Sequence, residues 1–465
     1  MPWVTKLFTK ASRLPFNFFS QNMLERYFSL AANGTNLRTE IVAGASSFLA
    51  TMYIIVVNPA ILSQTGMSFS GVLTATVLLS FFCSLMMGLY ARNPLLVAPG
   101  MGLNAFFTFA VVKGMGVAWP TALGAVFWAG IIFLILSIFN VRTAIVAAIP
   151  KPLRYAISSG IGLFIVFIGL ANAKLIVGNP ATLVGLGQLH DPILLTFLFG
   201  LALTAVLVTR RVSGAIVIGI AITTLAAWPI GRWWGDASAV NFGQTALVNW
   251  RGLWAAPDFS LFLQLDLLGA LKWSLWPVIF AFTFTDLFDS LSTFVGVAEA
   301  ANLQDSDGNP RNVRQSLLTD AVATTLAGVL GTSPGTAYIE SAVGVAQGGR
   351  TGLVAVVAAF LFLPFLFLSP LLSIVPSIAT APALVLVGVF MMKPIAQINW
   401  QRLDEAIPCL LALVLIPFSY SITQGIIFGL LSWTLLKIGT GQSRAISPTL
   451  WIIDAFAVLA LVVGH

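Results

Sequence analysis

Four polar residues stand inside long apolar stretches of this 465-residue chain. The stretches are NPLLVAPGMGLNAFFTFAVV (93–112) with Asn104, FTFTDLFDSLSTFVG (282–296) with Asp286 and Asp289, and GTSPGTAYIESAVGVAQGGRTG (331–352) with Glu340. A carboxyl group in apolar surroundings can take up and release a proton, and an ionised one accepts hydrogen bonds. Such residues are costly to bury, so they indicate a functional site by default.

The two aspartates are three residues apart, which places them on one face of a helix, and Ser290 and Thr293 continue that face. No Lys or Arg lies in this stretch to neutralise them. We therefore favour proton transfer or binding for Asp286 and Glu340 over helix capping. Asp289 either carries a proton, orients Asp286 or bridges to a neighbouring helix.

Three further acids are open to simpler interpretations. Asp320 fits capping and function equally well. Glu40 and Asp191 stand at segment starts, where an acid stabilises the helix N-terminus.

The composition excludes a soluble domain, because 58% of the residues are hydrophobic and only 8% are charged, against about 25% in soluble proteins. The chain is an all-α polytopic membrane protein. Its net charge of +7 is explained by cations retained on the cytoplasmic side rather than by nucleic-acid binding. Cys83 and Cys409 are far apart and the chain has two histidines, so we expect no metal site, no cofactor and no His-based triad.

A membrane span needs about 20 apolar residues, and this criterion predicts fourteen segments. They are 41–63, 69–90, 95–112, 119–140, 155–173, 190–209, 213–230, 268–298, 315–331, 332–347, 352–370, 374–392, 405–421 and 422–440. With the N-terminus in the cytoplasm, eighteen of the 23 Lys and Arg residues fall on the cytoplasmic side. The charge distribution therefore supports both the number of segments and the orientation.

The longest interruption divides these segments into seven and seven, which predicts two inverted repeats. The predicted units are a cytoplasmic lead-in, a first repeat, an extracellular connection, a second repeat and a C-terminal tail that lies on the membrane interface or packs against the bundle. Their boundaries are 1–40, 41–230, 231–267, 268–440 and 441–465.

The third segment of each repeat contains Pro and Gly close together. Pro99, Gly100 and Gly102 interrupt one, and Pro334 and Gly335 interrupt the other. Broken backbone is tolerated at membrane depth only where protein or a cavity satisfies it, and a matched pair indicates a substrate site. Notches for helix packing are the simpler alternative. We predict that both segments begin extended and meet at mid-membrane.

These residues predict a proton-coupled carrier for a small polar solute, of which a planar heterocycle is one candidate. Phe48, Phe106 and Tyr338 could cover a flat ring, although ordinary packing is a strong alternative in a chain with 35 Phe residues. The candidate substrate-binding residues are Asn104, Asp286, Glu340, Phe48, Ala105, Phe106, Tyr338 and Gly335, and the candidate proton-coupling residues are Asp286, Asp289 and Glu340.

Four stretches together resemble the AzgA-type purine permeases of the nucleobase/cation symporter group. They are GTNLRTEIVAGASSFLATMYIIVVNP (34–59), ARNPLLVAPGMGLNAFFTFAVV (91–112), FTDLFDSLSTFVGVA (284–298) and LLTDAVATTLAGVLGTSPGTAYIESAVGVAQGGRTGL (317–353). The family's third-span asparagine falls on Asn104, its eighth-span acids on Asp286 and Asp289, and its tenth-span acid on Glu340.

The resemblance implies uptake of adenine, guanine or hypoxanthine with a proton across the cytoplasmic membrane. It implies a core domain, a gate domain made of segments 5–7 and 12–14, and a homodimer formed through the gate.

Three alternatives differ in class. A carrier of the same fold could take uracil, xanthine or an anion, but two or three carboxylates without a basic residue would repel an anion. A membrane hydrolase needs two acids that share a proton, and Asp286 and Asp289 on one helix are poorly placed to face each other. A channel needs no opposed broken segments with titratable acids.

Overall fold

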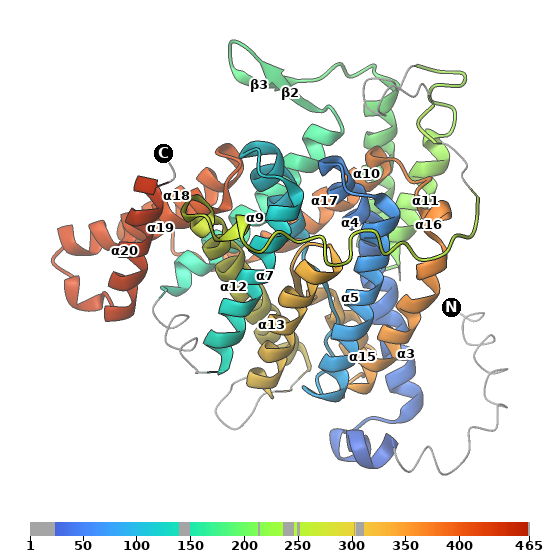
Figure 1. The fold of residues 1–465 in the computed structure, drawn as a ribbon, viewed down its shortest axis with the longest axis horizontal. Helices are drawn as coiled ribbons and strands as arrows, with labels where there is room; N and C mark the ends of the chain where they lie inside the picture. Colours follow the sequence, from blue (N-terminus) through green and yellow to red (C-terminus); the bar gives the residue numbers. More distant parts are fainter. Residues whose placement is uncertain are drawn as a thin grey trace.

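The computed structural model describes residues 24–138, 149–212, 214–235, 246–248, 252–301, 303 and 311–463. It is built almost entirely of helices (Figure 1). The cytoplasmic lead-in up to residue 23 and part of the connection predicted at 231–267 lie outside the described residues.

One group of helices, here called the central bundle, packs around the two interrupted segments. Its elements are α3 (Leu37–Thr51), α4 (Ile54–Leu62), α5 (Phe69–Leu89), β1 (Val97–Pro99), α6 (Met101–Ala105), the π-helix η3 (Phe106–Gly114), α7 (Trp119–Ile138), α12 (Trp276–Ala301), α13 (Val313–Leu330), β4 (Gly335–Ala337), the 3-10 turn η6 (Ile339–Ser341), α14 (Ala342–Ala346), α15 (Leu353–Phe362), η7 (Leu363–Phe367) and α16 (Ser369–Leu372).

A second group, here called the lateral bundle, packs mainly on itself. Its elements are α9 (Lys151–Asn172), α10 (Pro192–Thr209), α11 (Ala215–Ala227), α17 (Ser377–Met391), η8 (Lys393–Gln397), α18 (Leu403–Phe418) and α19 (Ile422–Gly439). The two bundles meet where α6 and α12 contact α9, where α12 contacts α19, and where α17 contacts α4.

The remaining elements lie at the periphery. The hairpin β2 (Ile176–Asn179) and β3 (Leu183–Leu186) projects from one end of the molecule, at the top of Figure 1. The predicted tail forms α20 (Pro448–Val463), which packs on α19, and Thr434 donates a hydrogen bond of 2.6 Å to Asp454. Short 3-10 turns are η1 (Ala31–Asn33), η2 (Ser63–Thr65), η4 (Gly269–Leu271), η5 (Trp273–Leu275) and η9 (Ser443–Ala445).

Among the described residues, seven helices are long and apolar enough to cross a membrane, and three shorter apolar helices accompany them. The predicted segment at 268–298 begins late: residues 269–275 form 3-10 turns, and the α-helix starts at Trp276. Pro277 explains the start, because a proline without an N–H is tolerated in the first helical turn.

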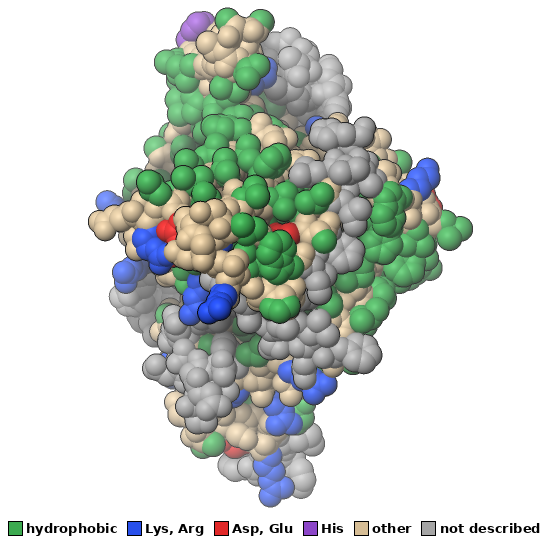
Figure 2. Space-filling view, turned by 90° about the vertical axis from the view of Figure 1, so that its left-hand side faces the viewer, with side chains coloured by type: hydrophobic (Ala, Val, Ile, Leu, Met, Phe, Trp, Pro, Cys, Tyr) green, Lys and Arg blue, Asp and Glu red, His purple; other side chains and the backbone are tan. Residues whose placement is uncertain are grey.

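Large apolar side chains are exposed on the outer faces of both bundles, as a lipid-facing surface requires. Leu225 on α11 is 70% exposed and Phe360 on α15 is 55% exposed. On the face in Figure 2 hydrophobic side chains cover a broad upper area, and most Lys and Arg side chains lie below it.

The two acids predicted at helix starts differ in role. Asp191 caps α10 as expected, since its carboxylate accepts a hydrogen bond of 2.9 Å from the Ile193 N–H. Glu40 lies in the first turn of α3, but its carboxylate accepts hydrogen bonds from the Arg350 N–H (2.8 Å) and the Thr351 hydroxyl (2.6 Å). Glu40 therefore also ties α3 to the segment that precedes α15.

Candidate functional site

Both interrupted segments begin with extended backbone, and these extended parts pair with each other. Strand β1 is antiparallel to β4, with Val97 opposite Ala337 and Pro99 opposite Gly335. Two further backbone bonds of 2.9 Å extend the pairing: the Gly100 N–H donates to Pro334 O, and the Tyr338 N–H donates to Leu96 O. Segments about 240 residues apart in the sequence thus meet as predicted.

Side chains satisfy the backbone groups that this small sheet leaves open. The Ser84 hydroxyl of α5 accepts from the Val97 N–H at 2.9 Å and donates to Val97 O at 3.0 Å. The Ser341 hydroxyl accepts from the Leu96 N–H at 2.9 Å. Because buried backbone must be paired inside an apolar slab, these serines make the interruption possible.

The glycines of the break allow a close approach of backbone. A side chain at Gly335 would meet the Cβ of Ala323 on α13 at 2.9 Å, and one at Gly100 would meet the Thr336 methyl group at 2.7 Å. In this structure Gly335 therefore allows packing between β4 and α13.

The Glu340 carboxylate has a hydroxyl partner. It accepts a hydrogen bond of 2.7 Å from the Tyr53 hydroxyl, and the Tyr53 and Tyr338 rings lie 6.5 Å apart. Glu340 is half-buried, so it remains partly accessible. Tyr53 was not predicted from the sequence, because a tyrosine in the apolar run TMYIIVVNP carries no spacing signal of its own.

Hydroxyl groups on helices α12 and α13 also form hydrogen bonds with the carboxyl groups of Asp286 and Asp320. The Thr324 hydroxyl on α13 lies within hydrogen-bond distance of the Asp286 carboxyl group and of Gly335 O (3.1 Å), and its one hydrogen bonds one of them at a time. Ser290 on α12 donates to the Asp320 carboxylate. Asp286 and Asp320 are completely buried, whereas Asp289 is half-buried.

Asn58 of α4 connects the two interrupted segments and was not selected from the sequence. Its amide donates to the Thr76 and Thr332 hydroxyls, both at 2.8 Å, and accepts from Asn104 Nδ2 and the Ser333 hydroxyl, both at 3.2 Å. All four hydrogen-bonding positions of this buried amide are therefore used.

Asn104 itself has a free acceptor. Its side chain is fully buried, and its Oδ1 atom has no hydrogen-bond partner among the residues that the structure describes. A buried polar atom without a partner costs about 1–3 kcal/mol. The N–H group of a ligand would remove this cost.

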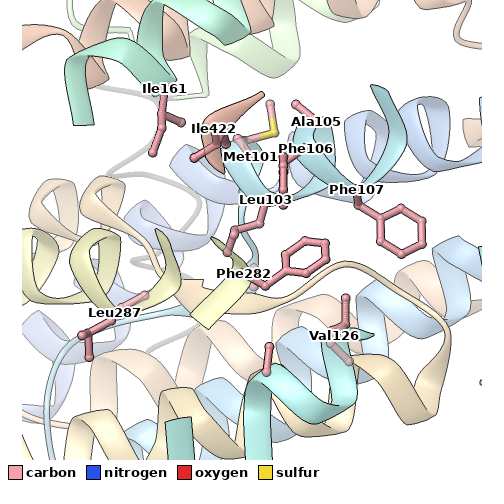
Figure 3. Close-up of a cluster of buried hydrophobic side chains, with 14 of the residues drawn as sticks. Met101, Leu103, Ala105, Phe106, Phe107, Val126, Ile161, Phe282, Leu287 and Ile422 are labelled. Carbon is pink, nitrogen blue, oxygen red and sulfur yellow. The ribbon is translucent and has the colours of Figure 1, made fainter. Parts of the chain in front are cut away.

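The predicted aromatic residues lie in apolar packing. Phe106 is edge-on to Phe282 with 4.9 Å between ring centroids, and Ala105 lies beside it, fully buried (Figure 3). Phe48 packs against Phe362 at 5.0 Å. Tyr338 donates a hydrogen bond to Pro99 O and lies nearest to Glu340 in sequence among these rings.

Comparison with known proteins identifies the family. A family model described as "Permease family" matches residues 38–428. This chain belongs to that permease family. The membership agrees with the resemblance inferred from the sequence, and the chain is a multi-pass membrane protein of a family of permeases rather than enzymes.

Relatives of this permease align over nearly their whole length. It is 44% identical to "Adenine permease AdeP" of Escherichia coli (strain K12) over 95% of this chain and 96% of that one. It is 41% identical to "Guanine/hypoxanthine permease PbuO" of Bacillus subtilis (strain 168) over 93% of this chain and 98% of that one.

A solved structure shares the fold of this permease. The transmembrane domain of the cyanobacterial bicarbonate transporter BicA superposes with a TM-score of 0.59 at 17% identity, covering 85% of this chain and 97% of that one. The fold is therefore that of known membrane transporters.

Proposed function

We propose that this permease imports purine nucleobases such as adenine, guanine or hypoxanthine together with protons. The observation that carries the proposal is the cluster of hydroxyl-partnered acids at two paired, interrupted segments, beside the unused acceptor of Asn104. Relatives that are adenine and guanine/hypoxanthine permeases supply the substrate class.

Glu340 and Asn104 are the proposed primary contacts to the base. Both present acceptor oxygens, which match the ring and exocyclic N–H groups of a purine. Glu340 is already partly accessible, whereas Asn104 is sealed in this structure, so we infer that it contacts the base after the bundles have moved. Tyr338 with Tyr53 would flank the base, while Phe48, Ala105, Phe106 and Gly335 shape the surrounding packing.

The coupling proton would bind among Asp286, Asp289 and Glu340. The hydroxyl partners of Asp286 and Glu340 match either protonation state, because a hydroxyl group both donates and accepts. Asp286, like Asn104, is fully buried, so its contact with substrate would also require movement.

We infer the following arrangement in the membrane. Fourteen segments cross it as two inverted repeats (41–230 and 268–440), with the N-terminus in the cytoplasm. The central bundle acts as the core, and the lateral bundle acts as the gate and carries the interface of a homodimer. Transport is then a rocking movement of one bundle against the other around the site.

Uptake into proteoliposomes tests the function. Labelled adenine, guanine and hypoxanthine are supplied with an inward proton gradient, with and without an uncoupler, to wild type, Glu340→Gln and Asp191→Asn. Asp191→Asn is the matched control, because asparagine caps a helix as well as aspartate. We expect uptake that the uncoupler collapses, that Glu340→Gln abolishes and that the control retains.

Two results would contradict different parts of the proposal, the substrate class and the proton coupling. If correctly inserted wild type takes up none of the three purines, the substrate class is wrong, and uracil, xanthine and small anions are tested next. If uptake ignores the uncoupler and the gradient, proton coupling is wrong although the substrate class stands.

A further inference from the structure

The segment that leads into α12 crosses one end of the central bundle. It covers residues 252–275 and is here called the strap; Figure 1 shows it as the yellow-green trace that passes from the side of α16 towards α12. Its backbone N–H groups donate to four elements in turn. The bonds are Ala255 to Phe367 O of η7 (3.1 Å), Asp258 to the Thr74 hydroxyl of α5 (3.0 Å), Leu263 to Val329 O of α13 (2.9 Å) and Asp266 to Pro120 O beside the start of α7 (2.9 Å).

The inner side of the strap is fitted closely to α5. The Asp258 carboxylate accepts hydrogen bonds from the hydroxyl groups of Ser68 (2.8 Å) and Ser70 (2.6 Å). Leu261 is buried, and a side chain in place of Gly71 would meet its Cγ atom at 2.8 Å. These contacts fix the strap against the helix and decide which of its side chains point away from the bundle.

The outer side of the strap is rich in large apolar side chains. Each of the following is at least 44% exposed: Trp254, Phe259, Phe262, Leu263, Leu268 and Trp273. Apolar surface left in water costs about 25 cal/mol per Å², and an exposed patch of this kind indicates an interaction surface. An ordinary aqueous loop would not carry it.

The strap lies level with the first turns of two membrane spans. Helix α5 has 21 residues and α7 has 20, so each is about 30 Å long, which is about the thickness of the hydrocarbon layer. Thr74, which binds Asp258, stands five residues after the start of α5, and a side chain at Gly124, five residues after the start of α7, would collide with Asp266 O. Five residues of helix rise about 7–8 Å, so the strap lies at the edge of that layer.

The backbone of the strap is paired as an apolar environment requires. Its regular structure consists of the short turns η4 and η5, yet many of its N–H groups have partners within the strap itself. Examples are Ser260 to the Asp258 carboxylate (2.9 Å), Phe262 to Phe259 O (3.0 Å), Gly269 to the Asp266 carboxylate (2.8 Å) and Leu275 to Lys272 O (2.9 Å). A loop in water can leave such groups to the solvent, whereas irregular backbone at membrane depth needs partners from the protein.

We propose that the strap is a lipid-binding segment, whose outer side chains insert between the acyl chains and headgroups of the bilayer at the end of the bundle where α5 and α7 begin. Trp is typical of this boundary, and the exposed polar side chains of Gln264 and Lys272 suit its headgroup side. Lipid is the occupant because the apolar surface continues onto the span α12, whose Trp276 is 42% exposed. The proposal rests on the membrane location of the chain and not on its substrate.

Spin labels on the full-length protein test this contact in liposomes of phosphatidylethanolamine and phosphatidylglycerol. Nitroxides are attached to Phe259→Cys and Leu268→Cys in the strap. Phe360→Cys on α15 is the reference for lipid, and Leu183→Cys in the projecting hairpin, where the leucine is 84% exposed, is the reference for water. Wild type gives the background labelling, because its two cysteines are buried. Power saturation compares the accessibility of each label to molecular oxygen and to a polar nickel chelate.

The ratio of the two accessibilities decides the result. Apolar oxygen concentrates among acyl chains and the polar chelate is excluded from them, so both strap labels should show a ratio at least about threefold higher than the Leu183→Cys label. A smaller ratio would place the strap in water and overturn the proposal. Low accessibility to both reagents would mean that protein covers the strap, which also overturns it; dipolar broadening between labels would then identify a second copy of this chain as the cover.

Folding of each labelled variant is checked by gel filtration and circular dichroism. Trp254→Cys, at a side chain that is 72% exposed, takes the place of a strap variant that does not fold. The measurement needs no substrate, so absence of purine uptake by wild type would contradict the proposed function and leave the result for the strap standing.

Discussion

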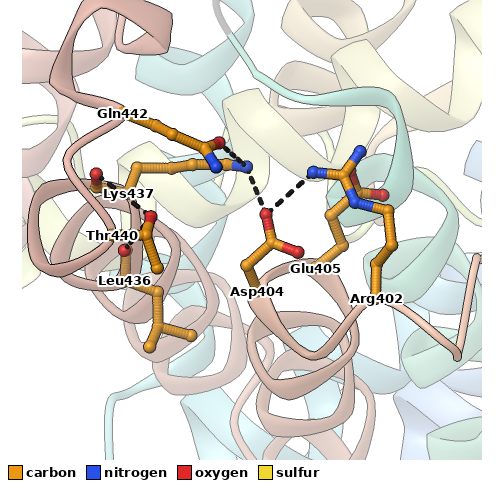
Figure 4. A network of polar contacts seen from close by, with 7 residues as sticks. All are labelled: Arg402, Asp404, Glu405, Leu436, Lys437, Thr440 and Gln442. Atoms are coloured by element: carbon orange, nitrogen blue, oxygen red, sulfur yellow. Dashed lines mark hydrogen bonds and ion pairs between the residues drawn. The ribbon is translucent and has the colours of Figure 1, made fainter.

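The acids of the central bundle and those at the end of the lateral bundle are satisfied by different chemistry. Hydroxyl groups form hydrogen bonds with Glu340, Asp286 and Asp320. Between the start of α18 and the end of α19, Lys and Arg side chains form ion pairs with the acids instead (Figure 4). There Asp404 lies 2.6 Å from Lys437 and 2.9 Å from Arg402, and Glu405 lies 2.7 Å from Arg402.

The hydroxyl-bonded carboxyl groups of the central bundle can change their charge, whereas the ion-paired carboxyl group of Asp404 stays ionised. Asp404 precedes the predicted segment 405–421, and hydrogen bonds from Lys437 and then Arg402 lower its pKa. A cation loses its attraction when the acid becomes neutral, whereas a hydroxyl group can reverse its direction and keep the bond. The central acids can therefore gain and lose a proton without losing their partners.

The same substitution in both regions gives the largest contrast. Asp286→Asn keeps the size of the side chain, and its amide oxygen can still accept from Thr324. We expect about a hundredfold loss of purine uptake, equivalent to about 3 kcal/mol. Asp404→Asn should leave uptake within about twofold, because Asp404 lies at the start of α18, outside the candidate site, and the amide oxygen can still accept a hydrogen bond from Lys437. Uptake is measured in proteoliposomes with matched protein content. Equal losses of uptake in both variants would contradict the functional difference between the central acids and Asp404.

Asn58 tests whether the neutral polar network positions the site. Asn58→Leu keeps a similar volume but removes all four hydrogen bonds to Thr76, Thr332, Asn104 and Ser333. Each buried group left unpaired costs about 1–3 kcal/mol, so we expect at least about a tenfold fall in initial uptake rate. Thr204→Val in α10 is the control, since in the described part of the chain its buried hydroxyl donates only to Gly200 O of its own helix. A normal rate in Asn58→Leu would contradict the positioning role.

Tyr53→Phe tests how much the hydrogen bond from Tyr53 to Glu340 contributes to substrate binding. The ring stays and only the hydroxyl group at 2.7 Å is lost. A hydrogen bond to a charged group contributes about 1.5–3 kcal/mol, so the KM for the purine should rise about tenfold or more. Radiolabelled uptake over a range of substrate concentrations measures this. A fall in maximal rate at constant KM would instead indicate that Tyr53 acts on the moving step.

Much of this arrangement could be predicted from the sequence. The Pro and Gly residues at 99–102 and 334–335 marked two interrupted segments, which pair as β1 and β4. Pattern alone sufficed, because few contexts allow helix breakers and bare acids in an apolar run. The start of α12 was placed too early because hydropathy does not separate 3-10 turns from an α-helix.

The polar residues that bond the acids, Asn104 and the paired strands could not be predicted. Tyr53 lies directly before α4, Asn58 in α4, Thr324 in α13 and Ser341 in η6. A single hydroxyl or amide in an apolar helix is usually bonded to its own backbone. Their role depends on which helices become neighbours, and sequence periodicity carries no information on that pairing.

The smallest effect on uptake is expected when the ion pair between Lys437 and Asp404 is removed. Lys437→Met removes the bond to Asp404 and should leave purine uptake within about twofold while lowering the unfolding midpoint by a few degrees. Because Lys437 lowers the pKa of Asp404, its stabilisation is present above the ordinary aspartate pKa of about 4 and is lost as the pH falls below it. The difference in midpoint between wild type and variant should therefore be constant above about pH 5 and shrink as the pH falls through about 4 to more acidic values.

Thermal unfolding followed by tryptophan fluorescence in detergent measures this difference. Part of it should persist at low pH, since Lys437 also donates to Gln442 at 2.9 Å and lies 5.1 Å from the Trp433 ring centroid. A difference that stays constant with pH would mean that these neutral contacts carry the whole effect. Asp404 would then not be held ionised by its cation, and the contrast with the hydroxyl-partnered acids would have to rest on transport alone.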